Sequence, residues 1–260
     1  MEGNKTQASH PYVLLYWPTP PDWIPPPTFS SRQVTLCPKT RIRGFGTKFC
    51  SIPEGLVECP EGSFDLYNFI QISDQFENKE FDLVIVWTAS VEGFTPFNVK
   101  KLGCPTVLLA SDTHLWKLPV NYLLVYWMTE GFDYVATIYD RQHLHWFAAA
   151  GVENLAWLPW ISMSTITSEW SESRERQVVF IGRQSAYHPR RCRLARLLRE
   201  ANLTFLARTA NRQEAASLFA TSLISLNCSA NGDLNLRNLE VISAGGFLLT
   251  DRLSFASGFD

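Results

Sequence analysis

The sequence has few of the features that mark nucleic-acid-binding, membrane-spanning or secreted proteins. Only 18% of its 260 residues are charged, and the formal net charge of −2 argues against a general nucleic-acid binder. The longest apolar run, Leu118–Met128, is interrupted by Pro119 and Asn121 and is shorter than the roughly 20 residues of a membrane span. Residues 1–10 are polar and lack the apolar core of a secretory signal. We therefore expect a cytoplasmic protein that has no transmembrane segment and binds no nucleic acid.

Closely spaced cysteines are also absent. The chain has six cysteines but no Cys-x-x-Cys pair. Zinc sites in proteins usually combine closely spaced cysteines or histidines, so this spacing disfavours a metal site. The cysteines are expected to be free thiols, as in a reducing compartment.

Apolar residues make up 46% of the chain, which predicts a substantial buried core. Many of them form short continuous runs, a pattern typical of parallel strands that are covered on both faces. The runs that predict strands are Tyr12–Trp17, Leu83–Trp87, Thr106–Ala110, Tyr134–Tyr139 and Leu155–Leu158. Helical patterns lie between them, the clearest at Arg141–Ala150 before Gly151. This alternation predicts an α/β fold, with a flexible tail at 1–11 and a doubly wound, Rossmann-like domain at 12–161.

A polar segment, residues 162–176, interrupts this pattern and predicts an interdomain linker. A second α/β series follows it. Its predicted strands are Val178–Ile181, Leu203–Leu206, Leu223–Asn227 and Phe247–Thr250, and its predicted helices are Pro189–Ala201, Arg212–Ala220 and Leu234–Ala244. The sequence thus predicts a second Rossmann-like domain at 177–260. Because no helix follows its fourth strand, we expect this domain to be truncated at its C-terminus.

Positive charge is concentrated at the start of this second series. Between Arg174 and Arg212 there are ten Arg, two Glu and no Lys or Asp, so the local charge is +8 and the rest of the chain carries −10. Arginine suits bidentate capture of phosphate or carboxylate. The alternative is a solvated helix face. The residues expected on that face are Arg193, Arg196 and Arg199, while Arg190 and Arg191 are secondary candidates for anion binding.

The strongest local signal is the segment Asn231–Asp251, with the sequence NGDLNLRNLEVISAGGFLLTD. It predicts a strand-to-helix loop in which Asp233 or Asn235 is a natural N-cap. A helix N-terminus offers free N–H groups to an anion, and Arg237 in the first turn can add a guanidinium to the same anion. Glu240, one turn further along, can reach a ribose diol. The segment therefore indicates a site for a phosphorylated nucleoside.

This segment resembles the CgeB-type, spore-maturation glycosyltransferase-like family of GT-B glycosyltransferases. The shared features are the run Asn-Gly-Asp-x-Asn-x-Arg, the Glu after it, and Leu-Leu-Thr-Asp. The similarity extends upstream over Phe132–Thr137, Ala149–Asn154, Trp157–Pro159 and Val179–Arg183, and so covers about residues 105–260. The resemblance implies two Rossmann-like domains, with a nucleoside-diphosphate sugar held by the second and an acceptor at the first.

The resemblance also implies roles for single residues. Glu240 matches the family glutamate that binds the ribose of the donor. Many retaining relatives have another acidic residue eight positions earlier, where this chain has Gly232. The adjacent Asp233 could substitute for that acid or could cap the helix. Asn231, Asn235 and Arg237 are expected to complete the donor site.

Gly182 and Arg183 follow the first strand of the second series, at its carboxyl end. Glycine there permits close approach of the backbone to a ligand, and Arg183 can neutralise a departing diphosphate. The alternative reading is a turn glycine beside a solvated arginine. We interpret both residues as part of the donor site.

In the first domain, Asp112 and His114 follow the predicted strand Thr106–Ala110 and are the candidate catalytic residues. An aspartate and a histidine two positions apart could orient an acceptor hydroxyl or accept its proton. Alternatively, Asp112 caps the next turn and His114 packs beside Trp116.

Together these observations predict a metal-independent GT-B glycosyltransferase that moves a sugar from a nucleoside-diphosphate donor to an unknown acceptor, either a glycan, a protein or a small molecule. The sequence has no Asp-x-Asp pair that could clamp a metal ion, and no cofactor is expected besides the donor substrate. The alternative hypothesis is a non-catalytic protein of the same fold that binds nucleotide sugars.

Overall fold

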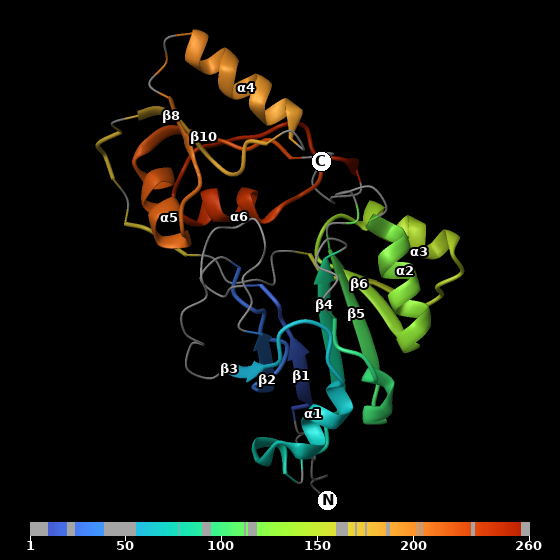
Figure 1. The fold of residues 1–260 in the computed structure, drawn as a ribbon. Coiled ribbons are helices and arrows are strands. Elements are labelled where there is room, and N and C mark those ends of the chain that lie inside the picture. The colour runs from blue at the N-terminus through green and yellow to red at the C-terminus, as the bar shows by residue number, and fades with distance from the viewer. Residues whose placement is uncertain are drawn as a thin grey trace, which may run out of the picture.

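The computed structural model describes residues 10–19, 24–38, 56–77, 79–89, 95–111, 113, 119–159, 166–169, 171–174, 176–185, 188–201, 203, 205–229 and 232–255. Within these ranges the chain forms one seven-stranded and one four-stranded β-sheet, and every strand pairing is parallel (Figure 1). This mixed α/β architecture is compatible with the Rossmann-like fold that the apolar runs predict.

The seven-stranded sheet has the strand order β3-β2-β1-β4-β5-β6-β7. The strands are β1 (Tyr12–Tyr16), β2 (Arg32–Pro38), β3 (Leu56–Cys59), β4 (Leu83–Ala89), β5 (Thr106–Ser111), β6 (Tyr134–Thr137) and β7 (Leu155–Trp157). The five strands predicted here are present, whereas β2 and β3 were not predicted. In β2 the residues Arg32, Gln33 and Thr35 interrupt the apolar pattern, which is why the run does not stand out.

The two faces of this sheet bury alternate residues of each strand, as the pleat of a β-strand requires. In β1, Leu14 and Tyr16 belong to one apolar cluster, whereas Val13 and Leu15, with Trp17 directly after the strand, belong to the cluster on the opposite face. The associated helices are α1 (Leu66–Ile72), η1 (Asp74–Phe76), η2 (Val99–Leu102), α2 (Pro119–Glu130), η3 (Arg141–Leu144) and α3 (His145–Ala149). The last two correct the single helix predicted at 141–150, which begins with a turn of 3₁₀-helix.

The four-stranded sheet has the order β11-β10-β8-β9. Its elements are β8 (Arg176–Ile181), α4 (Pro189–Glu200), β9 (Phe205–Arg208), α5 (Arg212–Ala220), β10 (Ser222–Leu226), α6 (Leu236–Ser243) and β11 (Leu248–Leu249). Each corresponds to an element predicted from the sequence, with shifts at the ends. The chain passes from β8 to β9 on one side and then returns to β10 on the other side of β8. The carboxyl ends of β8 and β10 therefore form a topological switch point.

Helix α6 lies between the two sheets. Figure 1 shows it on the side of the four-stranded sheet that faces the seven-stranded one. Leu236 at its start is buried in the same apolar cluster as Trp17 and Trp87 from β1 and β4. The start of α6 is therefore packed against the carboxyl ends of central strands in the first sheet.

The end of α6 is fixed by two glycines. Gly245 has a φ of +73°, and the N–H groups of Gly245 and Gly246 donate to the carbonyls of Ile242 and Val241. This is the bonding of a Schellman C-cap. A Cβ atom on Gly246 would lie 3.0 Å from the carbonyl oxygen of Phe219 and 3.0 Å from Cγ1 of Val241. The close packing of α6 on α5 thus requires glycine at 246.

We expect Gly246→Ala to lower the free energy of unfolding by about 1–3 kcal/mol, the usual range for overpacking. The added methyl would push against the backbone of Phe219, which cannot rotate away. Urea unfolding measures the effect. The control is Ile242→Ala at the same end of α6, where the side chain is exposed and the expected change is within about 0.5 kcal/mol. Equal stability of the Gly246→Ala variant and the wild type would contradict the packing argument.

Five of the six cysteines lie in the described part of the chain, and all five are free thiols, as predicted. Burial raises the pKa of the Cys37 thiol to about 12. Among the described helices, none is both long enough and apolar enough to span a membrane.

Candidate functional site

The candidate site lies at the switch point of the four-stranded sheet. Gly182 and Arg183 follow β8 directly, and the loop that begins at Asn227 follows β10 and leads into α6. Both segments therefore begin at the carboxyl end of a parallel strand, which is where open α/β sheets bind their ligands. Arg183 is half-buried there.

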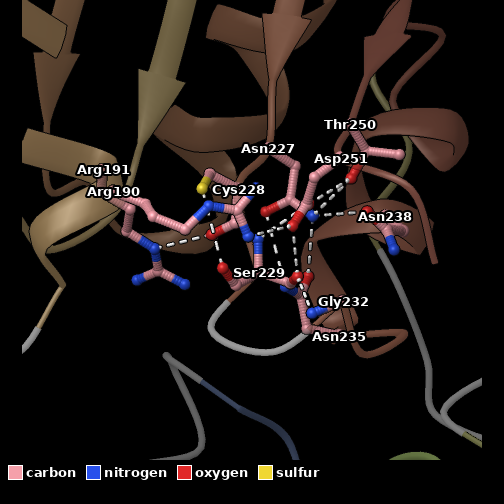
Figure 2. A network of polar contacts seen from close by, with 10 residues as sticks. All are labelled: Arg190, Arg191, Asn227, Cys228, Ser229, Gly232, Asn235, Asn238, Thr250 and Asp251. Carbon is pink, nitrogen blue, oxygen red and sulfur yellow. Dashed lines mark hydrogen bonds and ion pairs between the residues drawn. The ribbon is translucent and has the colours of Figure 1, made fainter. Parts of the chain in front are cut away.

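Asn227 is the centre of a polar network that joins β10, α6 and β11 (Figure 2). Its side chain is 3% exposed, and its Nδ2 donates to Oδ1 of Asn238 at 2.6 Å, Oγ1 of Thr250 at 3.2 Å and Oδ1 of Asn235 at 3.3 Å. Asn235 is the N-cap residue of α6. The network therefore fixes the position of the helix start relative to the sheet.

A second set of contacts holds the loop between β10 and α6. Asp251, just after β11, accepts hydrogen bonds from N and Oγ of Ser229, at 3.0 and 2.7 Å, and from Nη1 of Arg190 at 3.2 Å. The Ser229 hydroxyl in turn accepts from the N–H of Gly232 at 2.7 Å. Figure 2 shows these contacts side by side with those of Asn227.

The structure explains the glycine at position 232. Gly232 has a φ of +76°, a conformation that favours glycine, and a Cβ atom there would lie 3.1 Å from the carbonyl oxygen of Arg252. The carbonyl of Gly232 accepts from the N–H of Ser254 at 2.7 Å. The segment after β11 thus passes so close to this loop that an acidic side chain does not fit at 232 without a shift of the backbone.

Of the two residues expected to cap helix α6, Asp233 and Asn235, only Asn235 has the N-cap position. Asp233 is buried, and helix α6 begins after Asn235, so the expectation that Asp233 caps the helix is wrong. Asn235 has the position of the N-cap, but its side chain makes no capping hydrogen bond and pairs with Asn227 instead. The N–H groups in the first turn of α6 are therefore not satisfied by that side chain, and they remain suited to an anion.

Arg191, a secondary candidate for anion binding in the sequence, lies beside the loop before α6 in the structure. It lies in the first turn of α4, is half-buried, and donates from Nε to the carbonyl oxygen of Cys228 at 2.7 Å. Figure 2 shows its guanidinium at the edge of the network, where its terminal nitrogens carry no contact to the residues drawn. Burial lowers the pKa of Arg191 and the nearby charge of Arg237 acts in the same direction, whereas the charges of Asp233 and Asp251 oppose the shift. An anion at the loop would stabilise this positive charge.

Arg237 and Glu240 form a separate group on the side of α6 that faces α5. Nη1 of Arg237 lies 2.6 Å from Oε2 of Glu240, and the guanidinium lies 5.3 Å from the ring centre of Phe219. Glu240 also lines a small cavity together with Arg212 and Ile166. Burial lowers the pKa of Arg212, and the negative charge of Glu240 opposes that shift. Glu240 is thus held between two arginines beside an open space.

The predicted site residues therefore fall into three groups. Asn235 and Asp233 lie in the loop before α6, and Arg237 and Glu240 lie together on its first turns. Gly182 and Arg183 lie at the neighbouring strand end. Asn231, Asp112 and His114 lie outside the described residues, so their roles remain predictions.

A comparison with known families finds a match in the second part of the chain. Residues 164–260 match the family model Glyco_trans_1_2, described as glycosyl transferase-like. The match covers β8 to β11 and every residue that the sequence predicts for a donor site. It supports a glycosyltransferase family and a transfer function for this chain. No curated protein matches the sequence.

Within the described residues, no three His, Cys, Asp or Glu side chains lie together as a metal-binding group. Charged groups of both signs lie near the loop, since Asp233 and Asp251 accompany Arg190, Arg191 and Arg237. Arg190 pairs with Asp251 and Arg237 pairs with Glu240, whereas Arg191 donates to the neutral carbonyl of Cys228. Of these arginines, Arg191 is therefore the best placed to bind an anion.

Proposed function

We propose that this protein is a GT-B glycosyltransferase of the CgeB type, which transfers a sugar from a nucleoside-diphosphate donor to an acceptor hydroxyl without a metal ion. The observation that carries the proposal is the glycosyltransferase-like match over the same residues that form the switch-point loop, α6 and the arginines beside them. The two sheets would form the two domains of that fold, joined by the linker at 162–176.

In the proposed reaction, the acceptor oxygen forms a bond to the anomeric carbon of the sugar while the bond from that carbon to the diphosphate oxygen breaks. The electron pair of the broken bond stays on the diphosphate. The first turn of α6 and Arg191 would neutralise this charge, with Arg183 at the neighbouring strand end. The proton of the acceptor hydroxyl would pass to a base, for which Asp112 and His114 are the candidates.

Glu240 would bind the ribose of the donor. Its carboxylate pairs with Arg237 through Oε2 and would accept hydrogen bonds from the ribose diol, and the cavity beside it is bordered by the apolar residues Ile166 and Phe219. Arg237 would then orient Glu240 in addition to the anion-binding role expected from the sequence. This arrangement gives the ribose and the diphosphate separate positions on the same helix.

We expect Glu240→Ala to weaken nucleotide binding by about 1.5 kcal/mol, roughly tenfold, through loss of a charge-assisted hydrogen bond. Isothermal titration calorimetry with a nucleoside diphosphate measures the loss, and circular dichroism checks the fold. The matched control is Glu214→Ala on α5, since Glu214 is half-exposed and, like Glu240, forms an ion pair with an arginine, here Arg208 at the end of β9. Unchanged affinity in a folded Glu240→Ala variant would contradict the ribose assignment.

The alternative is a non-catalytic nucleotide-sugar-binding protein, which the glycine at 232 and the burial of Asp233 favour. A screen of common nucleotide sugars, followed by both binding and donor hydrolysis, separates the two functions. Turnover supports the transferase. Saturable binding without turnover supports the alternative, and the absence of both would contradict the proposed function.

A further inference from the structure

Asp140 lies at the carboxyl end of β6, in the seven-stranded sheet, and its side chain is 0% exposed. It is the N-cap residue of η3, but its carboxylate makes no capping hydrogen bond to that helix. A buried carboxylate is costly unless its oxygens accept hydrogen bonds. Its hydrogen-bond partners therefore show which segments it holds.

Two of those partners lie in segments that flank the four-stranded sheet, and the third is Gln142 in η3, whose Nε2 donates to Oδ2 at 3.5 Å. Oδ1 of Asp140 accepts from the N–H of Leu234 at 3.0 Å, and Oδ2 accepts from the hydroxyl of Ser254 at 2.8 Å. These contacts span 94 and 114 residues of the sequence. Figure 1 shows the red C-terminal segment passing next to the loops at this end of the seven-stranded sheet. A single carboxylate thus binds the loop before α6 and the segment after β11.

The two partners are also joined to each other. The N–H of Ser254 donates to the carbonyl of Gly232, so Asp140, Leu234, Gly232 and Ser254 form a closed set of contacts around the loop. Burial raises the pKa of the Asp140 carboxyl and the nearby charge of Asp233 raises it further, whereas the hydrogen bonds from Ser254 and Leu234 lower it. The hydrogen bonds from Leu234 in the loop and from Ser254 after β11 therefore oppose the effects of burial and of Asp233 on this carboxyl.

We propose that Asp140 is a positioning residue that fixes the donor-binding loop, residues 232–236, from the opposite sheet. The proposal rests on the proposed function, in which the N–H groups at the start of α6 bind the diphosphate of the donor. Holding the N–H of Leu234 and, through Ser254, the carbonyl of Gly232 sets the direction of that helix start. N–H groups that are fixed in position before the ligand arrives bind it more tightly than N–H groups that must first be ordered.

The test compares Asp140→Ala and Asp140→Asn with the wild type in calorimetric binding of uridine, guanosine, adenosine and thymidine diphosphates. We expect the alanine variant to bind the preferred diphosphate at least about tenfold more weakly, since it loses hydrogen bonds to a charged group. The asparagine variant should stay within about threefold, because its amide can still accept from Leu234 and can donate to the Ser254 oxygen.

The control is Asp133→Ala, at the opposite end of β6. Asp133 accepts from N and Oγ1 of Thr106, at 2.8 and 3.0 Å, so its removal breaks a comparable set of hydrogen bonds within the seven-stranded sheet. We expect this variant to lose stability and to keep wild-type affinity for the diphosphate. An equal loss of affinity in the Asp133→Ala and Asp140→Ala variants would overturn the proposal.

Two further outcomes separate this inference from the proposed function. Wild-type affinity in a folded Asp140→Ala variant overturns the positioning role and leaves the function intact. If the wild type binds none of the four diphosphates, the proposed function fails and the positioning role fails with it. Should the Asp140→Ala variant not fold, Ser254→Ala serves instead: an affinity about threefold weaker supports the proposal, and an unchanged one overturns it.

Discussion

Arg191→Ala should reduce the affinity for nucleoside diphosphates by about 100-fold or more, which corresponds to about 3 kcal/mol. The reason is the geometry of the guanidinium. Its Nε is fixed on the carbonyl oxygen of Cys228, so the two terminal nitrogens are held in one orientation before any ligand is present. A diphosphate at the start of α6 would gain two charge-assisted hydrogen bonds from a group that has already lost its rotational freedom.

Calorimetry with the diphosphate and with the corresponding nucleoside measures this effect. The loss should appear for the diphosphate and be much smaller for the nucleoside, which lacks the charge. Arg191→Lys should restore only part of the affinity, because an ammonium group cannot bind the Cys228 carbonyl and a phosphate as a planar fork does. Added salt should weaken binding more in the wild type than in the alanine variant.

The control for this prediction is Arg193→Ala on the same helix. Arg193 is exposed on α4. Its removal therefore takes away one positive charge but no guanidinium that is fixed beside the loop. We expect affinity within about twofold of the wild type. If the Arg193→Ala variant lost as much affinity as the Arg191→Ala variant, the general positive charge of α4 would explain the binding, and the specific role of Arg191 would be wrong.

The elements of the fold could be predicted wherever a strand is buried on both faces. The runs in β1, β4, β5 and β6 are continuous and apolar, and they were found at nearly the right ends. Strand β2 escaped prediction because Arg32 at its exposed start and the half-buried Gln33 break the apolar pattern. A run of apolar residues indicates that a strand is buried on both faces. A strand that is only partly covered contains polar residues as well, and it is therefore harder to predict.

The site could be predicted only as far as its parts are local in sequence. The loop and the helix that carries Arg237 and Glu240 follow from spacing within one segment, although the helix begins at Leu236 and not at the predicted Leu234. The anchoring of Arg191 on Cys228 depends on a contact between distant segments, and the hydrogen bonds of Asp140 cross from one sheet to the other. Such long-range contacts produce no recognisable spacing of residues in the sequence. An aspartate shortly after a buried strand is only a weak indication of such a contact.

The sequence also predicts that Arg183 and Arg237 bind one shared diphosphate from two different strand-to-helix loops. From the sequence, both residues qualify because each follows a strand end or begins a helix. In the structure Arg237 is bound to Glu240 and lies over Phe219, which gives it a second role that spacing alone did not suggest. A shared anion for the two arginines remains a prediction, and Arg191 is the stronger partner for that anion.

Asn227→Ala should lower the free energy of unfolding by about 3 kcal/mol. The side chain is buried, and its Nδ2 satisfies oxygen atoms of three residues, namely Asn235, Asn238 and Thr250. Of these three residues Asn238 is buried, whereas Asn235 and Thr250 are half-buried. Leaving a buried acceptor without a partner costs about 1–3 kcal/mol, and the loss of the two half-buried contacts adds to that cost. Asn238 suffers most, since it is buried and its Nδ2 has no partner in the wild type either.

Urea denaturation at constant pH gives the value, with an unchanged slope showing that the unfolded states are comparable. The matched control is Asn154→Ala, in which an exposed asparagine loses a single hydrogen bond of 3.0 Å to the carbonyl of Asp133. Its expected cost is about 0.5 kcal/mol, because water replaces the lost partner. Thr250→Val should fall between the two, since it removes only one of the three acceptors. Equal costs for the Asn227→Ala and Asn154→Ala variants would mean that the network adds nothing beyond an ordinary surface hydrogen bond, and the start of α6 would then have to be held by its apolar contacts alone.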